Sequence, residues 1–251
     1  TEIKLGRRGV GFTATAEVMY RHCMHARFTL KVLRILYQFK ANHTDELYKL
    51  AARKSWEDIM NQDGSFTIDS TIYSDSFKHD QFATLRLKDA IVDRFRAKTG
   101  ERPSVDRDNP DARIHLHISK QDVTLSLDAC GEPLSRRGYR SRKAIAPLNE
   151  VLAAGLLALS GWEPGITLYD PMCGSGTFTC EAALWASGLP VQANRSHFAF
   201  MEWKNFNRTA WMTIRDEAME FNEPIPTTIY ASDINPDAIS QTKYALSQLD
   251  L

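Results

Sequence analysis

A glycine-rich segment at residues 170–177 holds the residue types that could most directly support chemistry. It reads Asp-Pro-Met-Cys-Gly-Ser-Gly-Thr and follows a short β-favouring run at residues 166–169. A strand that ends in a glycine-rich turn and enters a helix presents a ligand to the carboxyl edge of a parallel sheet. The segment therefore predicts a small-molecule site in this turn.

Three ligands compete for such a turn. A P-loop requires Lys after its last glycine, but Gly176 is followed by Thr177. A dinucleotide site calls for a third glycine where Thr179 stands, and the acidic Asp170 is an unfavourable neighbour for a pyrophosphate. S-adenosylmethionine has no phosphate and carries a positive amino group and a sulfonium, so an acid at the strand end suits it. The glycines let the backbone approach that ligand closely.

A second acidic residue follows the next expected strand, at residues 227–231. Asp233 is expected to accept hydrogen bonds from the two ribose hydroxyls, and Ile234 to lie against the adenine ring. Asp233 comes 63 residues after Asp170, whereas about 20 are usual, so we expect an insertion over residues 189–226. An ordinary strand–helix turn with a chance acid remains the alternative interpretation.

The elements around these residues indicate a parallel α/β sheet. We expect a helix over residues 148–159 that closes at Gly161, and a second helix over residues 177–187 that Gly188 stops. A third helix should begin at Pro236, with Asn235 as its N-cap. Helices that alternate with strands in this way are typical of α/β domains.

The front half predicts a mixed α+β domain. Helices are expected over residues 26–39, 45–60 and 81–100, and strands over residues 65–73, 113–119 and 122–127. Lys plus Arg and Asp plus Glu each total 31; residues 1–150 hold 26 basic against 20 acidic residues, and residues 151–251 hold 5 against 11. A basic front half favours a polyanionic partner, although two ordinary domains of opposite charge explain it equally well.

Composition also excludes some classes of protein. No run of about 18 apolar residues occurs, so no membrane-spanning helix is expected. The four cysteines show no Cys-x-x-Cys pairing. They are expected to be reduced thiols in a cytoplasmic protein.

Several motifs together resemble a known family. Residues 170–178 are similar to the cofactor motif of bacterial THUMP-domain class I methyltransferases, which use S-adenosylmethionine to methylate guanine N2 of large-subunit (23S) ribosomal RNA. Many of their relatives carry the description N6-adenine-specific DNA methylase. Further matching motifs lie at residues 131–134, 137–140, 146–150, 198–203 and 232–235. The resemblance covers residues 128–251 with several motifs in order, and the front half matches more weakly.

This resemblance implies a fold and a cofactor site. The fold is an α+β front domain (ferredoxin-like and THUMP) followed by an incomplete α/β Rossmann-like methyltransferase domain, with expected boundaries at residues 1–44, 45–137 and 138–251. Residues 147–150 would lie beside the methionine part of S-adenosylmethionine. The implied cofactor-binding residues are Asp170, Pro171, Cys173, Gly174, Gly176 and Thr177, with Asp233, Ile234 and Asn235 at the adenosine end.

The sequence departs from the family at one point. The family's catalytic motif, Asn/Asp-Pro-Pro-Tyr/Phe, is absent from these 251 residues, and the Asn-Pro-Asp segments at 109–111 and 235–237 lack its second proline and its aromatic residue. We therefore assign no catalytic residue and expect the parent protein to continue beyond Leu251. By itself this chain is expected to bind cofactor weakly and not to turn over.

A basic cluster precedes the cofactor segment. Contact with RNA phosphates and an ordinary solvated linker are both open as its role, and the resemblance favours RNA. The cluster comprises Arg136, Arg137, Arg140, Arg142 and Lys143.

Three other groups have ordinary structural explanations. His115 and His117 alternate with apolar residues and are expected on an exposed polar strand face rather than in a metal site. Cys173 is expected to pack in its loop rather than to act as a nucleophile. The aromatic residues between positions 198 and 211 are expected to pack an insertion against the sheet rather than to stack on bases.

The function predicted from these observations is S-adenosylmethionine-dependent methylation of guanine N2 in large-subunit ribosomal RNA, with that RNA as the partner and no metal. N6-adenine methylation of DNA is the first alternative. A nucleic-acid-binding protein with an inactive methyltransferase fold is the second, and a dehydrogenase is a distant third.

Overall fold

The computed structural model describes residues 3–6, 9–140, 147–220 and 223–249. The chain forms two compact units, neither of which is continuous in sequence. The glycine-loop unit comprises Thr1–Leu30, Pro133–Ser196 and Asn207–Leu251. The five-stranded unit comprises Lys31–Glu132 and His197–Phe206.

The five-stranded unit is built on one mixed sheet with the strand order β3-β7-β6-β4-β5. β7 pairs antiparallel with both of its neighbours, and β4 pairs parallel with β6 and β5. Along β6, Ile114, Leu116 and Ile118 are buried, whereas His115 and His117 between them are half-buried. This alternation gives the sheet one apolar and one polar face. The strands are β3 (Leu33–Lys40), β4 (Ser65–Tyr73), β5 (Ser104–Val105), β6 (Ala112–Ser119) and β7 (Asp122–Asp128).

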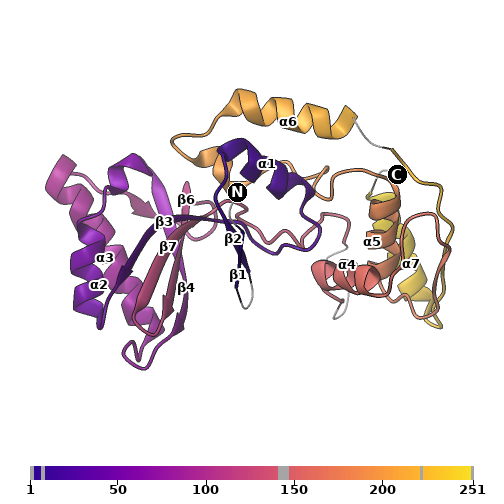
Figure 1. Ribbon diagram of the computed structural model, residues 1–251, viewed down its shortest axis with the longest axis horizontal. Helices are drawn as coiled ribbons and strands as arrows, with labels where there is room; N and C mark the ends of the chain where they lie inside the picture. Colours follow the sequence, from indigo (N-terminus) through magenta and orange to yellow (C-terminus); the bar gives the residue numbers. More distant parts are fainter. Residues whose placement is uncertain (1–2, 7–8, 141–146, 221–222, 250–251) are drawn as a thin grey trace. The chain divides into compact units, whose positions relative to one another are not determined.

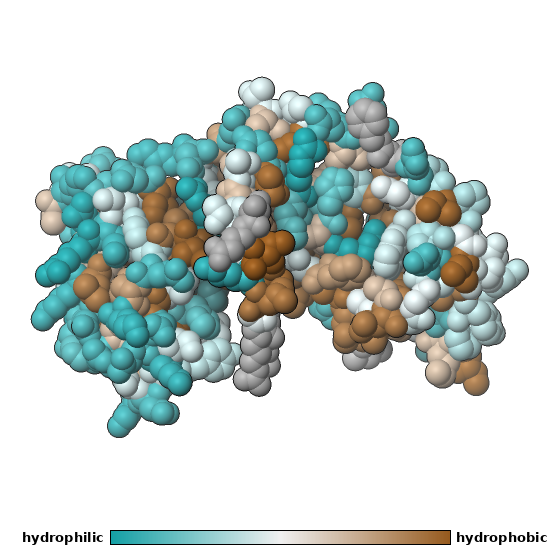
Figure 2. Space-filling view, in the orientation of Figure 1, coloured by the Kyte–Doolittle hydropathy of each residue, from teal (hydrophilic) through white to brown (hydrophobic). Residues whose placement is uncertain are grey.

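Two helices that contact each other, α2 (Thr44–Ala52) and α3 (Asp80–Thr99), lie on one side of this sheet (Figure 1). Leu87, Ile91 and Phe95 recur every four residues along α3 and are buried, so one stripe of the helix faces the core. Gly100 ends the helix in a left-handed conformation (φ 79°), as the sequence predicts. The outer surface over these helices is mainly hydrophilic (Figure 2).

Several expected elements of the front half are present at the predicted positions. Strands β4, β6 and β7 and helix α3 agree with the sequence to within one residue at each end. The helix expected over residues 45–60 is shorter, because α2 ends at Ala52 and a separate 3₁₀ turn, η1 (Trp56–Asp58), follows. The buried indole of Trp56 donates a hydrogen bond to the carbonyl oxygen of Ala51 (2.9 Å), and this contact satisfies one of the last carbonyls of α2.

The prediction of a helix over residues 26–39 is wrong. Residues 33–40 form β3, which pairs with β7, and the nearest helix is α1 (Ala16–His25). The register shifts between Ile35 and Tyr37, so the strand's alternation of apolar residues is interrupted. Because Leu33 and Ile35 are also exposed, their apolar character does not mark an inward face.

The glycine-loop unit contains the α/β elements predicted for the back half. Strands β8 and β9 pair in parallel, with Asp170 opposite Ala231. Helix α5 contacts α4, α7 and both strands, and α6 runs alongside α1 (Figure 1). The short hairpin of β1 (Ile3–Leu5) and β2 (Val10–Phe12) belongs to the same unit. The other elements are α4 (Glu150–Leu159), β8 (Leu168–Asp170), α5 (Thr177–Ala186), α6 (Arg208–Glu220), β9 (Ile229–Ala231) and α7 (Pro236–Ser247).

The insertion expected over residues 189–226 is divided between the two units. The 3₁₀ helix η2 (Ala199–Glu202) packs in the five-stranded unit, where the backbone N–H of Phe200 donates to the carbonyl of Ala129 (3.1 Å). Phe198 and Phe200 are fully buried, with stacked rings 5.1 Å apart. Trp211 on α6 instead packs edge-on against Tyr20 in the glycine-loop unit. These aromatic residues are packing residues, but Trp211 packs on helix α1 and not against a sheet, which differs from the prediction.

The predicted boundaries at 44/45 and 137/138 divide the chain into consecutive domains, and they stay a prediction. The compact units follow packing instead, so residues 31–44 lie with the five-stranded sheet and residues 1–30 with the glycine loop. Among the described residues, no helix is both long enough and apolar enough to cross a membrane.

Candidate cofactor-binding site

The loop between β8 and α5 depends on two glycines with positive φ. Gly174 (φ 54°) and Gly176 (φ 80°) adopt left-handed conformations that side chains disfavour. A Cβ on Gly176 would also lie 2.7 Å from the Cγ2 of Thr242 on α7. A Cβ on Gly174 would meet nothing within 4 Å, so the space over this residue is open.

Contacts from the residues that follow β9 and from α7 hold the loop in place. The backbone N–H of Cys173 donates to the carbonyl of Ser232 (3.0 Å). The N–H of Gly174 donates to Oδ2 of Asp233 (2.9 Å), and the hydroxyl of Thr242 donates to the carbonyl of Gly174 (2.9 Å). The thiol of Cys173 is buried with its Sγ 3.5 Å from the same hydroxyl oxygen. Cys173 is therefore a packing residue of the loop, as predicted.

Asp170 and Asp233 come to the carboxyl ends of two adjacent parallel strands, despite their separation in sequence. The carboxyl group of Asp170 is half-buried, and its burial raises its pKa, with a further increase from the charge of Asp233. The hydroxyl of Thr179 lies 3.5 Å from its Oδ2. A cationic ligand group beside this carboxylate would offset the loss of solvation.

Backbone hydrogen bonds to both carboxylate oxygens fix the orientation of the Asp233 side chain. Its Oδ1 accepts the N–H of Asn235 (2.9 Å) and its Oδ2 the N–H of Gly174, and these two hydrogen bonds lower its pKa. Because each carboxylate oxygen has two lone pairs, each retains one acceptor position. The next side chain, Ile234, is fully exposed.

Two other predicted residues have structural roles at helix starts. The side chain of Asn235 accepts the N–H of Asp237 (2.9 Å) and caps α7. Thr177, the first residue of α5, is buried, and its hydroxyl accepts a hydrogen bond from Arg140 (3.3 Å). Pro171 is exposed at the start of the loop.

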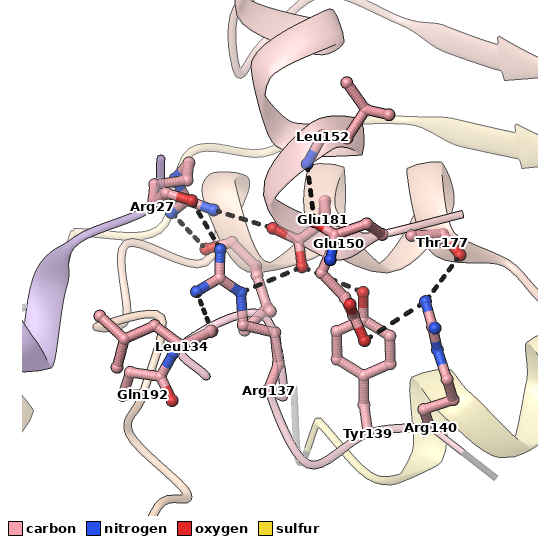
Figure 3. A network of polar contacts seen from close by, with 12 residues as sticks. Arg27, Leu134, Arg137, Tyr139, Arg140, Glu150, Leu152, Thr177, Glu181 and Gln192 are labelled. Carbon is pink, nitrogen blue, oxygen red and sulfur yellow. Dashed lines mark hydrogen bonds and ion pairs between the residues drawn. The ribbon is translucent and has the colours of Figure 1, made fainter. Parts of the chain in front are cut away.

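A buried polar network connects Arg137 and Tyr139 with Glu181 of helix α5 (Figure 3). The guanidinium of Arg137 is fully buried and lies 3.5 Å from Glu181 on α5. It also donates to the carbonyls of Leu134 and Arg27, at 2.6 Å each. The hydroxyl of Tyr139 donates to the same Glu181 oxygen (3.0 Å). Burial raises the pKa of Glu181, and Arg137 opposes that shift.

This network corrects the role expected for part of the basic cluster. Arg137 cannot contact RNA phosphates, because its side chain has no exposed surface and its donors are used internally. Arg140 is three-quarters buried and also engages protein groups. Arg136 is exposed, and Arg142 and Lys143 lie outside the described residues.

Sequence reasoning missed three residues of the site. Thr242 and Arg27 carry no local signal, because they lie far along the chain from the segments that they contact. Glu181 is an isolated acid among apolar residues of α5, and such a residue indicates a buried ion pair. No group of three or more candidate metal ligands occurs among the described residues.

The polar and apolar groups of the described site fit S-adenosylmethionine. Asp233 offers two outward acceptors suited to a pair of ribose hydroxyls, and the exposed Ile234 offers an apolar surface for a ring. The open space over Gly174 admits a ligand close to the backbone. Asp170 supplies negative charge near the same strand ends.

Two family models match the chain. Residues 41–128 match the THUMP domain, and residues 137–251 match the RMKL-like methyltransferase domain. The ribosomal RNA large subunit methyltransferase K/L of Desulfotalea psychrophila is 42% identical over 223 residues, which cover 87% of this chain and 31% of that protein. The chain thus spans about a third of the length of this curated relative.

Solved structures share the fold. A protein from Listeria monocytogenes described as a predicted N6-adenine-specific DNA methylase superposes with a TM-score of 0.89 at 28% identity, covering 100% of this chain and 66% of that one. SMU.472, whose structure was determined in complex with SAH, has a TM-score of 0.87 at 24% identity over 99% of this chain and 66% of its own. The predicted fold class, a THUMP domain followed by a Rossmann-like methyltransferase domain, is confirmed.

Proposed function

We propose that this chain provides the cofactor site and an RNA-binding domain of a large-subunit ribosomal RNA methyltransferase. The chain belongs to the methyltransferase family that joins a THUMP domain to an RMKL-like methyltransferase domain. The observation that carries the proposal is the placement of the 170–177 loop and Asp233 at adjacent strand ends, linked by the Gly174–Asp233 hydrogen bond. The names of the curated relatives, such as that from Desulfotalea psychrophila, supply the substrate class.

The chain's own residues divide the work of holding S-adenosylmethionine. When bound, this cofactor supplies a methyl group activated by its sulfonium. Asp233 accepts hydrogen bonds from the ribose hydroxyls, and Ile234 lies against the adenine. Gly174 and Gly176 let the loop backbone approach the ligand. Asp170 faces the cofactor's positive charge. These contacts fix the reactive methyl group in one position, which is how an enzyme gains rate by orientation.

The THUMP domain is the proposed RNA-binding part. Double-stranded and folded RNA is recognised mainly by shape and by contacts to phosphates and 2′-hydroxyls, and the excess of basic residues in the front half suits such a partner. We propose guanine N2 as the methylated atom. An enzyme of ribosomal RNA works where ribosomes assemble, so we also propose a cytoplasmic location.

The substrate is tested with the full-length gene product and labelled S-adenosylmethionine. Deproteinised large-subunit RNA, transfer RNA and duplex DNA are offered in parallel. Label in large-subunit RNA, recovered as N2-methylguanine, is the expected result. Label in DNA alone, recovered as N6-methyladenine, would replace the substrate and keep the cofactor site. Cofactor binding without any transfer would instead favour an inactive binding protein.

A matched pair of variants tests the cofactor site itself. Asp233→Asn removes a charge and one of the two free acceptor positions at the predicted ribose contact, so we expect the affinity for S-adenosylhomocysteine (SAH) to fall about tenfold or more. Asp237→Asn removes the same charge from the exposed first turn of α7 and should bind SAH as the unmodified protein does. Titration calorimetry measures both, and equal affinities in the two variants would refute the ribose assignment.

A further inference from the structure

Arg140 joins two segments that come from different parts of the chain. Its Nη2 donates to the carbonyl oxygen of Leu148 (2.6 Å) and to the hydroxyl of Thr177 (3.3 Å), and it lies 3.3 Å from Oε1 of Glu150. Leu148 and Glu150 flank the N-cap of α4, whereas Thr177 opens α5 directly after the glycine loop. Figure 3 shows the guanidinium of Arg140 directed toward Glu150 and Thr177.

Two of these contacts satisfy a backbone carbonyl and a buried carboxylate at the start of α4. The carbonyl of Leu148 precedes α4, so the hydrogen bonds within that helix do not satisfy it. Glu150 is buried, and burial raises the pKa of its carboxyl group, which Arg140 partly offsets. A buried carboxylate that loses its cationic partner is strongly destabilised. One side chain thus stabilises the start of two helices.

The placement of Arg140 excludes a simple surface role. Its side chain is only 24% exposed, and its contacts are with the protein itself. Arg137, three residues earlier, stabilises the same region through Glu181 and the carbonyls of Leu134 and Arg27, and these contacts do not reach the loop. Arg140 therefore differs from Arg137 in touching Thr177, a residue of the proposed cofactor loop.

We propose that Arg140 is a positioning residue for the cofactor: it holds the start of α4 against the first residue of α5, so that both segments are in place before the ligand binds. This inference rests on the proposed function, because it presumes that the 170–177 loop binds S-adenosylmethionine. Pre-organisation of this kind increases affinity by removing the cost of ordering the site upon binding. Arg140 acts through Leu148, Glu150 and Thr177.

The test compares Arg140→Gln with Arg215→Gln in the full-length protein. Both variants lose one positive charge from the glycine-loop unit, but Arg215 is exposed on α6. We expect Arg140→Gln to weaken SAH binding about five- to twentyfold, as measured by calorimetry. Arg215→Gln should leave it unchanged. Affinity for large-subunit RNA should be equal in Arg140→Gln and the unmodified protein.

A conservative variant separates positioning from folding. Arg140→Lys keeps the charge near Glu150, but one ammonium lacks the planar fork of a guanidinium and cannot serve all three acceptors equally. We expect it to retain the thermal midpoint within about 2 °C and to weaken SAH binding about threefold. In the same samples, hydrogen exchange at residues 150–153 and 177–180 should be faster than in the unmodified protein.

Four results would overturn the inference. SAH affinity in Arg140→Gln equal to that of the unmodified protein would remove the positioning role. If Arg140→Gln does not fold, unchanged SAH affinity in a folded Arg140→Lys protein would remove it as well. Loss of RNA affinity with SAH binding intact would assign Arg140 to a phosphate contact. Absence of SAH binding in the unmodified protein would refute the proposed cofactor site itself, a failure distinct from the other three.

Discussion

Two glycines of the same loop adopt left-handed conformations in different surroundings. Gly174 faces open space, whereas the missing Cβ of Gly176 would collide with Thr242. A non-glycine residue in this region of φ/ψ space costs roughly 1 kcal/mol. A forced contact in a packed site adds typically about 1–3 kcal/mol. The two positions therefore separate backbone strain from steric exclusion.

We expect Gly176→Ala to lower the free energy of unfolding of the glycine-loop unit by about 2–4 kcal/mol. Gly174→Ala should lower it by only about 1 kcal/mol. Hydrogen exchange at the amides of α5 and α7 measures both values in the full-length protein. Equal destabilisation by the two alanines would show that Thr242 moves aside and that its contact does not matter.

Individual residues of the site differ in how far the sequence could predict them. The positions of Asp170, the glycines and Asp233 were predictable, because a strand end, a tight turn and an acid are each local patterns, whereas their contact with the cofactor stays a prediction. The roles of Arg137 and Arg140 were not. A basic cluster before a domain has the same composition whether its side chains contact phosphate or a buried acid, and Glu181 lies more than 40 residues away.

At the level of elements, predictions succeeded where one periodicity dominated. Helix α3 and strands β4, β6 and β7 have a clear period and clear ends, so their bounds followed from the sequence. Strand β3 fits a helical period about as well as a strand period, because of the irregular register near Ile35. Its partner β7 begins about 80 residues later, and pairing over that distance leaves no local trace.

An ion pair links the 3₁₀ turn η1 to helix α3. Glu57 accepts hydrogen bonds from Arg94 (2.7 and 3.2 Å) and contacts Lys98. The hydrogen bonds from Arg94 are the largest cause that lowers the pKa of Glu57 from 4.5 to about 2. Since the folded state holds this carboxyl group ionised, the pair contributes stability above about pH 4.5 and loses it as the pH falls toward 2.

We expect Glu57→Gln to destabilise the five-stranded unit at neutral pH, and this deficit should shrink as the pH falls from about 5 to 2. Hydrogen exchange at the amides of α3 over that range measures the difference. Asp58→Asn removes the same charge from an exposed position on the same turn and should show a smaller deficit. A deficit that stayed constant with pH would assign the effect of Glu57→Gln to packing and not to charge.

At the scale of the whole molecule, the chain passes from one compact unit to the other four times. The segment His197–Phe206 lies within the methyltransferase half of the sequence, but it packs with the five-stranded unit. Sequence motifs are read as continuous blocks, so the boundaries predicted from them could not reveal this exchange. The aromatic residues on either side of position 207 therefore report on different units.

We expect two alanine variants only eleven positions apart to destabilise opposite units. Phe200 is fully buried against Phe198 and Phe206, so Phe200→Ala should destabilise the five-stranded unit by about 3–5 kcal/mol. Trp211→Ala should destabilise the glycine-loop unit, where Trp211 packs on Tyr20. Hydrogen exchange resolved by peptide should show faster exchange in β6 and β7 for the first variant and in α1 and α6 for the second. If both variants accelerated exchange in both units equally, the units would unfold as one cooperative body, and the division of the insertion would carry no energetic meaning.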